Sequence, residues 1–425
     1  MDYVNLDYEP SENDLIAMYY VEISPECKNL EHASEEIAKE SSIGTWTEIA
    51  TLSAEIAERL KPSTFYINPK KNIIKIAYTK EFFEANNLPQ ILSAIAGNIY
   101  GMKVIKSLRL LDISFPKDIV HFYKGPKFGI EGIRKLTKVK DRPILGTIVK
   151  PKVGLNEIEH AKTCGEAWNG GLDIVKDDEN LTNMTFNKFE KRIIETLKIR
   201  DKAENETGER KFYMPNITAP LRIMKNRADF VIENGGEYVM LDILTVGFSA
   251  LQEIRDYLDD KSIVIHAHRA MHAALTRNKK HGITMLALSK IMRLIGMDQL
   301  HTGTVVGKME GGKREVLECN EILTSQKIFD NSETKLNQDW GSIKSTLPVA
   351  SGGLSPLHIP DLIEILGKDM VYQFGGGCHG HPDGTKAGAK AIRQAVDAVL
   401  SGSTLKEYAK KKPELTKAIE KWGKK

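Results

Sequence analysis

From residue 126 onward, the sequence alternates short β-rich runs with helix-like stretches, and the alternation occurs eight times. Strands that alternate with helices are typical of a parallel sheet, and eight such units are typical of a closed barrel. We therefore expect an α/β fold whose main domain is a (β/α)8 TIM barrel. The eight runs begin at Ile144, Leu172, Lys211, Tyr238, Ser262, Gln299, Ser345 and Val371.

The first 125 residues follow a different pattern, in which alternating runs that indicate strands are interleaved with amphipathic stretches that indicate helices. These segments lie at 15–23, 30–42, 64–79 (a hairpin signal), 89–98 and 107–113. We therefore expect an N-terminal α+β, ferredoxin-like domain before the barrel. The expected boundaries are 1–125 for this domain, 126–405 for the barrel and 406–425 for a lysine-rich helical tail.

Composition argues against several classes of protein. Lys and Arg number 60 against 57 Asp and Glu, a formal charge of +3, whereas a protein that coats nucleic acid is expected to be strongly basic. No stretch approaches ~20 consecutive apolar residues, so we expect no membrane span. The polar, acidic start is not typical of a signal or transit peptide. Because the four cysteines form no C-x-x-C pair, we expect no disulfide framework or zinc finger and a reducing, cytoplasmic location.

Polar residues and glycines gather where the expected barrel strands end. In a parallel barrel these C-terminal ends lie on one face, where the active sites of such enzymes are found. The loops after the last two runs both carry glycines, which let backbone N–H groups approach an anion and favour phosphate binding over simple tight turns. The residues concerned are Lys150, Lys152, Lys176, Asp178, Glu179, His266, His268, Arg269, His301, Ser351, Gly352, Gly353, Gly375 and Gly376.

The motif KDDEN, residues 176–180, ends the second run. Side chains two apart on a strand point to one face, so Lys176 and Asp178 are expected to share a face. Asp178 and Glu179 could supply carboxylate oxygens to Mg²⁺, but a cationic lysine beside them would repel the metal. Carbamylation by CO₂ would turn Lys176 into a third oxygen ligand. It requires the neutral amine, which burial favours and the neighbouring acids disfavour, so the residues alone leave this undecided.

Two groups of histidines could suggest a transition metal. In His266-x-His268-x3-His272 no matching carboxylates accompany the histidines. This favours acid–base or phosphate contact for His268 and a structural hydrogen bond for His266. The second group, Cys378-His379 with His381, is assigned to the turn after the eighth run.

The segment TGTVVGKMEGGK resembles a phosphate-binding loop but does not match its pattern. Thr302 stands where the first glycine is required, and Met309 follows the lysine instead of Ser or Thr. The segment is better described as a loop that carries a glycine-flanked Lys308 and closes over a bound substrate.

Taken together, six barrel segments resemble the signature segments of the ribulose-bisphosphate carboxylase (Rubisco) large chain. They are GTIVKPKVGL, GGLDIVKDDEN, HAHRAMHAALTR, HTGTVVGKMEGG, LPVASGG and QFGGGCHGHPDG. The N-terminal segments ESSIGTWTE and GNIYGMK fit the same family. The resemblance covers nearly the whole chain, and the short length is most similar to the archaeal form III enzymes.

The resemblance implies a metal site at the KDDEN motif. Lys176 would be carbamylated by an activator CO₂ and, with Asp178 and Glu179, would hold Mg²⁺ against the C2 and C3 oxygens of ribulose 1,5-bisphosphate. The carbamate would then be the base for the C3 proton. Lys150 would act as the acid–base lysine, supported by Lys152.

It also implies how the substrate is held. His268 would contact the sugar hydroxyls, and Lys308 would hold the carboxylate formed from CO₂. One phosphate would bind at Arg269, His301 and Ser351. The other would bind at the glycine loops, namely Gly352, Gly353, Gly375 and Gly376, together with Thr45 and Trp46. Thr45, Trp46, Glu40 and Asn98 would come from a neighbouring subunit, which implies a homodimer or a ring of dimers.

The function implied is a Mg²⁺-dependent carboxylase that forms two 3-phosphoglycerates, with reaction of O₂ as a side reaction and a role in salvaging the ribose of AMP and other nucleotides. The alternatives are a Rubisco-like enolase or tautomerase, and a non-catalytic sugar-phosphate-binding protein. Three departures from the plant-like pattern, Ile148, Met309 and Cys378-His379, remove no catalytic group.

Overall fold

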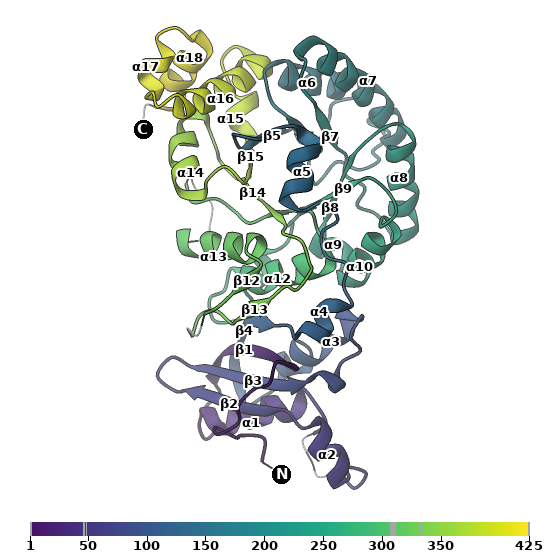
Figure 1. The fold of residues 1–425 in the computed structure, drawn as a ribbon, viewed down its shortest axis with the longest axis vertical. Coiled ribbons are helices and arrows are strands. Elements are labelled where there is room, and N and C mark those ends of the chain that lie inside the picture. Colours follow the sequence, from purple (N-terminus) through teal and green to yellow (C-terminus); the bar gives the residue numbers. More distant parts are fainter. Residues whose placement is uncertain (1, 46, 48, 307–311, 331–332, 424–425) are drawn as a thin grey trace. The chain divides into compact units, whose positions relative to one another are not determined.

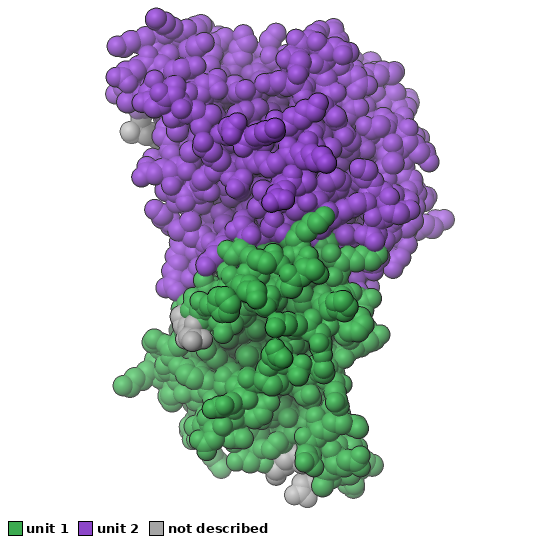
Figure 2. Space-filling model, viewed as in Figure 1, with its two compact units in different colours: residues 1–125, 271–296, 325–344 green, residues 126–270, 297–324, 345–425 purple. Residues whose placement is uncertain are grey.

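The computed structural model describes residues 2–45, 47, 49–306, 312–330 and 333–423. The chain forms two compact units, which Figure 2 shows in different colours. Unit 1 contains residues 1–125, 271–296 and 325–344, and unit 2 contains residues 126–270, 297–324 and 345–425. Within the described ranges, no helix is sufficiently long and apolar to cross a membrane.

Unit 1 is an α+β unit built on one main sheet. Its strands are β1 (Asp14–Ile23), β2 (Ser63–Asn68), β3 (Ile73–Thr79), β4 (Ile105–Ser114), β10 (Gly282–Ile283), β12 (Lys327–Ile328) and β13 (Gln338–Asp339). Its helices are α1 (Leu30–Glu40), α2 (Ala54–Leu60), η1 (Lys80–Phe82), α3 (Leu88–Ile95), η2 (Asn98–Gly101), α4 (Lys117–His121), α11 (Ala273–Thr276) and α12 (Met285–Ile295). The main sheet has the order β10-β4-β1-β3-β2, and its last four strands are antiparallel. With α1 and α3 in the connections this is a βαββαβ pattern, so the expected ferredoxin-like fold is confirmed.

Unit 2 contains one strand from each of the eight expected runs. These are β5 (Ile144–Ile148), β6 (Ile174–Lys176), β7 (Phe212–Met214), β8 (Tyr238–Asp242), β9 (Val264–His268), β11 (Gln299–His301), β14 (Leu347–Ser351) and β15 (Val371–Gln373). The helices are α5 (Gly129–Thr137), α6 (Glu157–Asn169), α7 (Phe189–Thr207), α8 (Leu221–Glu233), α9 (Ile243–Val246), α10 (Phe248–Tyr257), α13 (Lys313–Thr324), η3 (Pro356–His358), α14 (Ile359–Leu366), α15 (Gly376–His379), α16 (Gly384–Leu400), α17 (Leu405–Ala409) and α18 (Pro413–Trp422). The lysine-rich end is thus helical, as expected.

The eight strands form a parallel sheet that closes on itself (Figure 1). The order is β7-β6-β5-β15-β14-β11-β9-β8, and a parallel bridge between Asn216 and Met240 joins its two ends. At this seam Ile217 N donates to Met240 O at 3.1 Å. The expected (β/α)8 barrel is therefore confirmed. Its apolar core contains residues from seven strands, including Ile144, Ile174, Phe212, Tyr238, Val264, Leu347 and Val371.

A capping residue fixes where α6 begins after the loop that follows β5. Asn156 caps α6: its side chain accepts from Glu159 N at 3.0 Å, and Glu159 Oε2 accepts from Asn156 N at 3.0 Å. This reciprocal capping box satisfies backbone donors that the first helical turn would leave unpaired. The segment 149–155 is therefore a short loop between β5 and a helix whose N-terminus is stabilised by a capping box.

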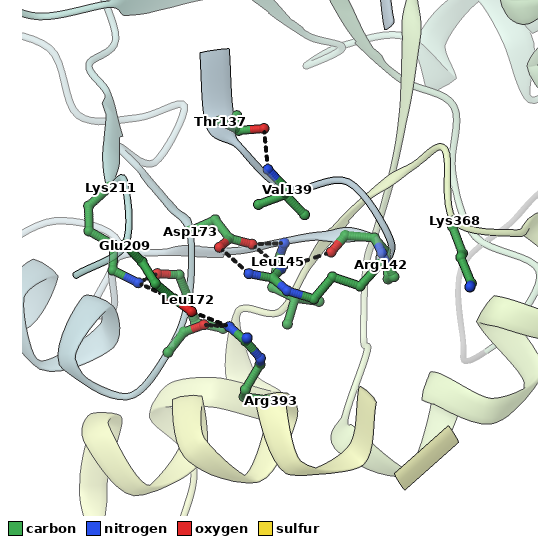
Figure 3. A network of polar contacts seen from close by, with 12 residues as sticks. Thr137, Val139, Arg142, Leu145, Leu172, Asp173, Glu209, Lys211, Lys368 and Arg393 are labelled. Carbon is green, nitrogen blue, oxygen red and sulfur yellow. Dashed lines mark hydrogen bonds and ion pairs between the residues drawn. The ribbon is translucent and has the colours of Figure 1, made fainter. Parts of the chain in front are cut away.

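At the N-terminal ends of the strands, a buried ion pair joins β5 to β6. Arg142 and Asp173 point toward each other in Figure 3, with N–O distances of 2.6 and 2.7 Å. Asp173 also accepts from Leu145 N at 2.9 Å. The Arg142 side chain is 11% exposed and that of Asp173 is 1% exposed, so neither group has water as an easy alternative partner.

We expect Asp173→Ala to destabilise the protein by about 3 kcal/mol, because it leaves a buried guanidinium without its partner. The measurement is the thermal unfolding midpoint followed by circular dichroism. Asp369→Ala is the matched control, because Asp369 pairs with Arg134 but is 67% exposed, and such pairs contribute about 1 kcal/mol or less. Equal midpoints for the two variants would contradict the prediction.

Candidate active site

The polar residues expected at the strand ends lie on the C-terminal rim of the barrel. Lys176, His268, His301 and Ser351 are the last residues of β6, β9, β11 and β14. Lys150 follows β5 by two residues, and Gly375 follows β15 by two. Because all eight strands are parallel, these positions share one rim of unit 2.

Lys176 is completely buried at this rim. Its Nζ donates to the carbonyl oxygen of Asp177 at 2.6 Å. Burial lowers the pKa of Lys176, while the negative charges of Glu179 and Asp242 oppose that shift. The net effect increases the share of neutral amine, the form that reacts with CO₂.

Asp177 belongs to the scaffold beneath the rim. Its carboxylate accepts from Tyr213 Oη at 2.6 Å and lies 3.1 Å from both Arg192 Nη2 and His160 Nε2. Burial alone would raise the pKa of Asp177, but the charge of Arg192 and the hydrogen bond from His160 lower it below its ordinary value. These contacts hold the Asp177 side chain in place. Asp178 and Glu179 are therefore the acids of the KDDEN motif that could contact a metal ion.

The next two acids contact cationic side chains. Asp178 Oδ2 accepts from Lys150 Nζ at 2.6 Å, and Glu179 Oε1 accepts from Lys152 Nζ at 3.3 Å. Glu179 Oε2 lies 3.9 Å from His268 Nε2. Five expected site residues thus lie in two neighbouring groups of contacts, one around Asp178 and the other around Glu179.

The donor set around Lys176 fits Mg²⁺ only if the lysine is modified. In the described part of the chain, no group of three or more His, Cys, Asp or Glu side chains is arranged to hold a metal ion. Asp178 and Glu179 supply two carboxylates, and a carbamate on Lys176 would supply a third oxygen donor. Three oxygen donors with open positions for water and substrate suit Mg²⁺.

Asp242 is a site residue that sequence reasoning missed. It ends β8, and its Oδ1 lies 2.7 Å from His268 Nδ1. Burial and the charge of Lys176 lower the pKa of His268, while Asp242 opposes the shift. The Asp242 carboxylate accepts a hydrogen bond from Nδ1–H of His268. Nε2 of the neutral ring therefore carries no proton and can accept a hydrogen bond. Its position at a strand end was the available signal.

A chain of hydrogen bonds joins β9, β11 and β14. His266 Nδ1 lies 2.8 Å from Gln299 Oε1, and His266 Nε2 lies 2.8 Å from His301 Nε2. His301 Nδ1 in turn lies 2.8 Å from Ser351 Oγ. Burial lowers the pKa of His266 to about 3 and that of His301 well below its ordinary value, so both rings are neutral. The structural hydrogen bond expected for His266 is confirmed.

Glycines lie beside the residues expected to bind phosphate, at positions where a side chain would clash or would strain the backbone. A Cβ on Gly303 would lie 2.9 Å from Arg269 Nη2, and the φ of Gly303 is +107°. Gly352 and Gly353 have φ values of +110° and +66°, a region that side chains rarely adopt. Gly303 is buried, whereas Gly352 is half-buried and Gly353 is exposed, so an anion could reach the backbone at Gly352 and Gly353.

The site residues expected from a neighbouring subunit belong to unit 1. Glu40 and Thr45 line one pocket of about 200 Å³. Asn98 is exposed at the start of η2, where Gly97 occupies the cap position. Trp46 and Lys308 lie outside the described residues.

Comparison with known proteins identifies the family. Residues 129–422 match the model for "Ribulose bisphosphate carboxylase large chain, catalytic domain", and residues 2–119 match its N-terminal domain. A ribulose bisphosphate carboxylase of Methanocaldococcus jannaschii is 55% identical, with 99% of this chain and 100% of that protein covered.

Solved structures agree with this assignment. The octameric Rubisco of Pyrococcus horikoshii OT3 superposes with a TM-score of 0.93 at 48% identity, covering 99% of this chain and 96% of that one. The dimeric archaeal Rubisco of Hyperthermus butylicus also gives 0.93, at 41% identity, covering 99% and 98%. From the domain matches, the full-length identity and the shared fold, we conclude that the chain belongs to the ribulose bisphosphate carboxylase large chain family.

Proposed function

We propose that the chain is a Mg²⁺-dependent carboxylase, which adds CO₂ and water to ribulose 1,5-bisphosphate to form two 3-phosphoglycerates. The observation that carries the proposal is the arrangement at the end of β6, where a buried Lys176 precedes two carboxylates that contact Lys150 and Lys152. The names of relatives that align over their full length support the same reaction.

In this proposal Lys176 reacts with an activator CO₂ and, as its carbamate, joins Asp178 and Glu179 in holding Mg²⁺. The metal would polarise the sugar oxygens as a Lewis acid. Lys150 Nζ donates to Asp178 Oδ2 at 2.6 Å, so the proposed acid–base lysine lies beside one of the proposed metal ligands.

The protein's own groups then handle the protons. The carbamate on Lys176 accepts the C3 proton, and Lys150 protonates the carbanion of the product. His268, oriented by Asp242, accepts a hydrogen bond from a sugar hydroxyl through Nε2. Lys308 is proposed to hold the new carboxylate.

We assign the two phosphates to two sets of residues that follow neighbouring strands of the barrel, β9, β11, β14 and β15. Arg269, His301 and Ser351 would bind one phosphate. The glycine loops would bind the other, with Gly352, Gly353, Gly375 and Gly376 offering backbone N–H groups. In a homodimer or ring of dimers, Glu40, Thr45, Trp46 and Asn98 would complete the site of a neighbouring subunit. Structure neighbours described as octameric and dimeric support such an assembly, and light scattering would measure it.

Two finer proposals follow from the resemblance to archaeal enzymes. Reaction with O₂ would be a side reaction, seen as O₂ uptake that depends on ribulose 1,5-bisphosphate. The cellular role would be salvage of ribose from AMP and other nucleotides.

The decisive comparison is with an enolase or a binding protein on the same fold. The protein is incubated with ribulose 1,5-bisphosphate in deuterated water, with and without CO₂, and the products are analysed by mass spectrometry. A carboxylase needs CO₂ for both events. The C3 hydrogen exchanges and 3-phosphoglycerate forms only when CO₂ is present, because the proposed base is the carbamate on Lys176. Exchange without product in both conditions would favour an enolase, and neither exchange nor product would favour a binding protein.

A further inference from the structure

His379 ties the loop after β15 to the strand that leads to Lys150. It is the last residue of α15, and its Nε2 lies 2.9 Å from Thr147 Oγ1 on β5. Its Nδ1 lies 3.0 Å from Thr385 Oγ1 on α16. Both ring nitrogens are therefore engaged, one by a barrel strand and the other by an outer helix.

The partners determine where the protons lie. Thr147 Oγ1 donates to the carbonyl oxygen of Phe374 at 2.6 Å. The hydroxyl has only one proton, so toward His379 it can only accept, and Nε2 must carry the ring proton. Burial lowers the pKa of His379 to about 4, so near pH 7 the ring is neutral and Nδ1 accepts from Thr385.

Close backbone packing leaves α15 little room to move. A Cβ on Gly377 would lie 2.1 Å from the carbonyl oxygen of Leu354, in the loop after β14. A Cβ on Gly388 of α16 would lie 1.9 Å from the carbonyl oxygen of Cys378. The short helix is thus packed against both neighbours, and its hydrogen bonds to Thr147 and Thr385 fix its end.

We propose that His379 is a positioning residue that sets the spacing between the Gly375-Gly376 loop and Lys150. Thr147 precedes Lys150 by three residues, and the Cβ position of Gly375 lies 3.5 Å from Lys150 Cε. The hydrogen bond between His379 and Thr147 therefore links the loop assigned to a substrate phosphate with the lysine assigned to proton transfer. The inference rests on the proposed function, since it concerns the same substrate.

The test compares His379→Leu with His379→Gln in the full-length chain. Leucine fills similar space without a donor, whereas glutamine keeps an N–H that can reach Thr147. We expect His379→Leu to raise the KM for ribulose 1,5-bisphosphate about tenfold and to lower kcat less than about threefold. The Kd for the sugar, measured by calorimetry without CO₂, should rise in parallel. His379→Gln should stay within about twofold of the wild type in each quantity.

His381→Leu is the matched control on the same loop. His381 bonds to the carbonyl oxygen of Glu414 at 2.9 Å and to Asp383 N at 3.0 Å, away from β5. We expect it to lower the thermal midpoint and leave KM unchanged. Thr147→Val removes the same hydrogen bond from the other side, together with the bond from Thr147 to the carbonyl oxygen of Phe374. It carries the expectation for His379→Leu, as a minimum effect, if that variant does not fold. In a double variant, His379→Leu should add little to the effect of Thr147→Val.

An unchanged KM and Kd in His379→Leu, or an equal rise in His381→Leu, would overturn the inference. A wild-type protein that binds the sugar but forms no 3-phosphoglycerate would instead overturn the proposed carboxylase function. The Kd comparison would still test the role of His379 in that case.

Discussion

Lys176→Ala is expected to abolish CO₂ fixation, lowering kcat/KM by more than about a thousandfold, because the metal loses one of its three oxygen ligands and the reaction loses its proposed base. Activation by prior incubation with CO₂ and Mg²⁺ should disappear at the same time. The measurement is the initial rate of 3-phosphoglycerate formation, before and after that incubation, at several concentrations of ribulose 1,5-bisphosphate.

Lys211 provides the matched control for removing a buried lysine. It precedes β7 at the other end of the barrel strands, is also completely buried, and donates to the carbonyl oxygen of Leu172 at 3.0 Å. Lys211→Met should lower the thermal midpoint while leaving kcat within about twofold, since no reacting atom is near it. A folded Lys176→Ala protein that still fixes CO₂ would show that the metal site is assigned wrongly.

Lys150→Met is expected to lower kcat by about a hundredfold to ten-thousandfold, the range typical of a lost general acid or base. Binding of activator CO₂ and Mg²⁺ should persist, because Lys150 is not one of the proposed metal ligands. Its removal only takes away an ammonium group that contacts Asp178. The measurements are the turnover rate and the amount of CO₂ retained per chain when Mg²⁺ is present.

Lys152→Met separates proton transfer from general electrostatics. Lys152 is 57% exposed in its side chain and contacts Glu179 at 3.3 Å, so we expect only about a tenfold loss of kcat/KM. If Lys150→Met and Lys152→Met reduced turnover equally, Lys150 would have no special role in moving protons.

Much of the barrel could be predicted because its signals are local. Each strand is a short apolar run, and several end in a polar residue, as β6 ends in Lys176 and β14 ends in Ser351. Parallel strand order then brings these ends to one rim, so the expected site residues on different strands gather without any knowledge of contacts.

Other features depend on residues far apart in the chain. Asp242 is marked in the sequence only by its place at the end of a strand, and its role is seen only where it meets His268, 26 residues later. Residues 271–296 belong to unit 1 because Gly282 pairs with Arg109 of β4 and Lys290 forms a completely buried ion pair with Asp112 at 2.8 Å. No periodicity within 271–296 could indicate these partners.

The protonation of Lys176 was open for a similar reason. In the sequence, the acids of KDDEN are expected to raise the pKa of Lys176 and burial is expected to lower it, but the degree of burial is not known. Burial is complete in the folded protein, and it outweighs the acids in setting the direction of the pKa shift. Packing of the surrounding strands, not the motif itself, decides this balance.

Incorporation of labelled CO₂ tests the central claim most directly. The protein, handled without oxygen, is incubated with bicarbonate and Mg²⁺, mixed with labelled CO₂ and ribulose 1,5-bisphosphate, and quenched in acid. We expect acid-stable label in 3-phosphoglycerate, lost when a chelator replaces Mg²⁺. Well-folded protein that binds the sugar yet incorporates no label would contradict the account.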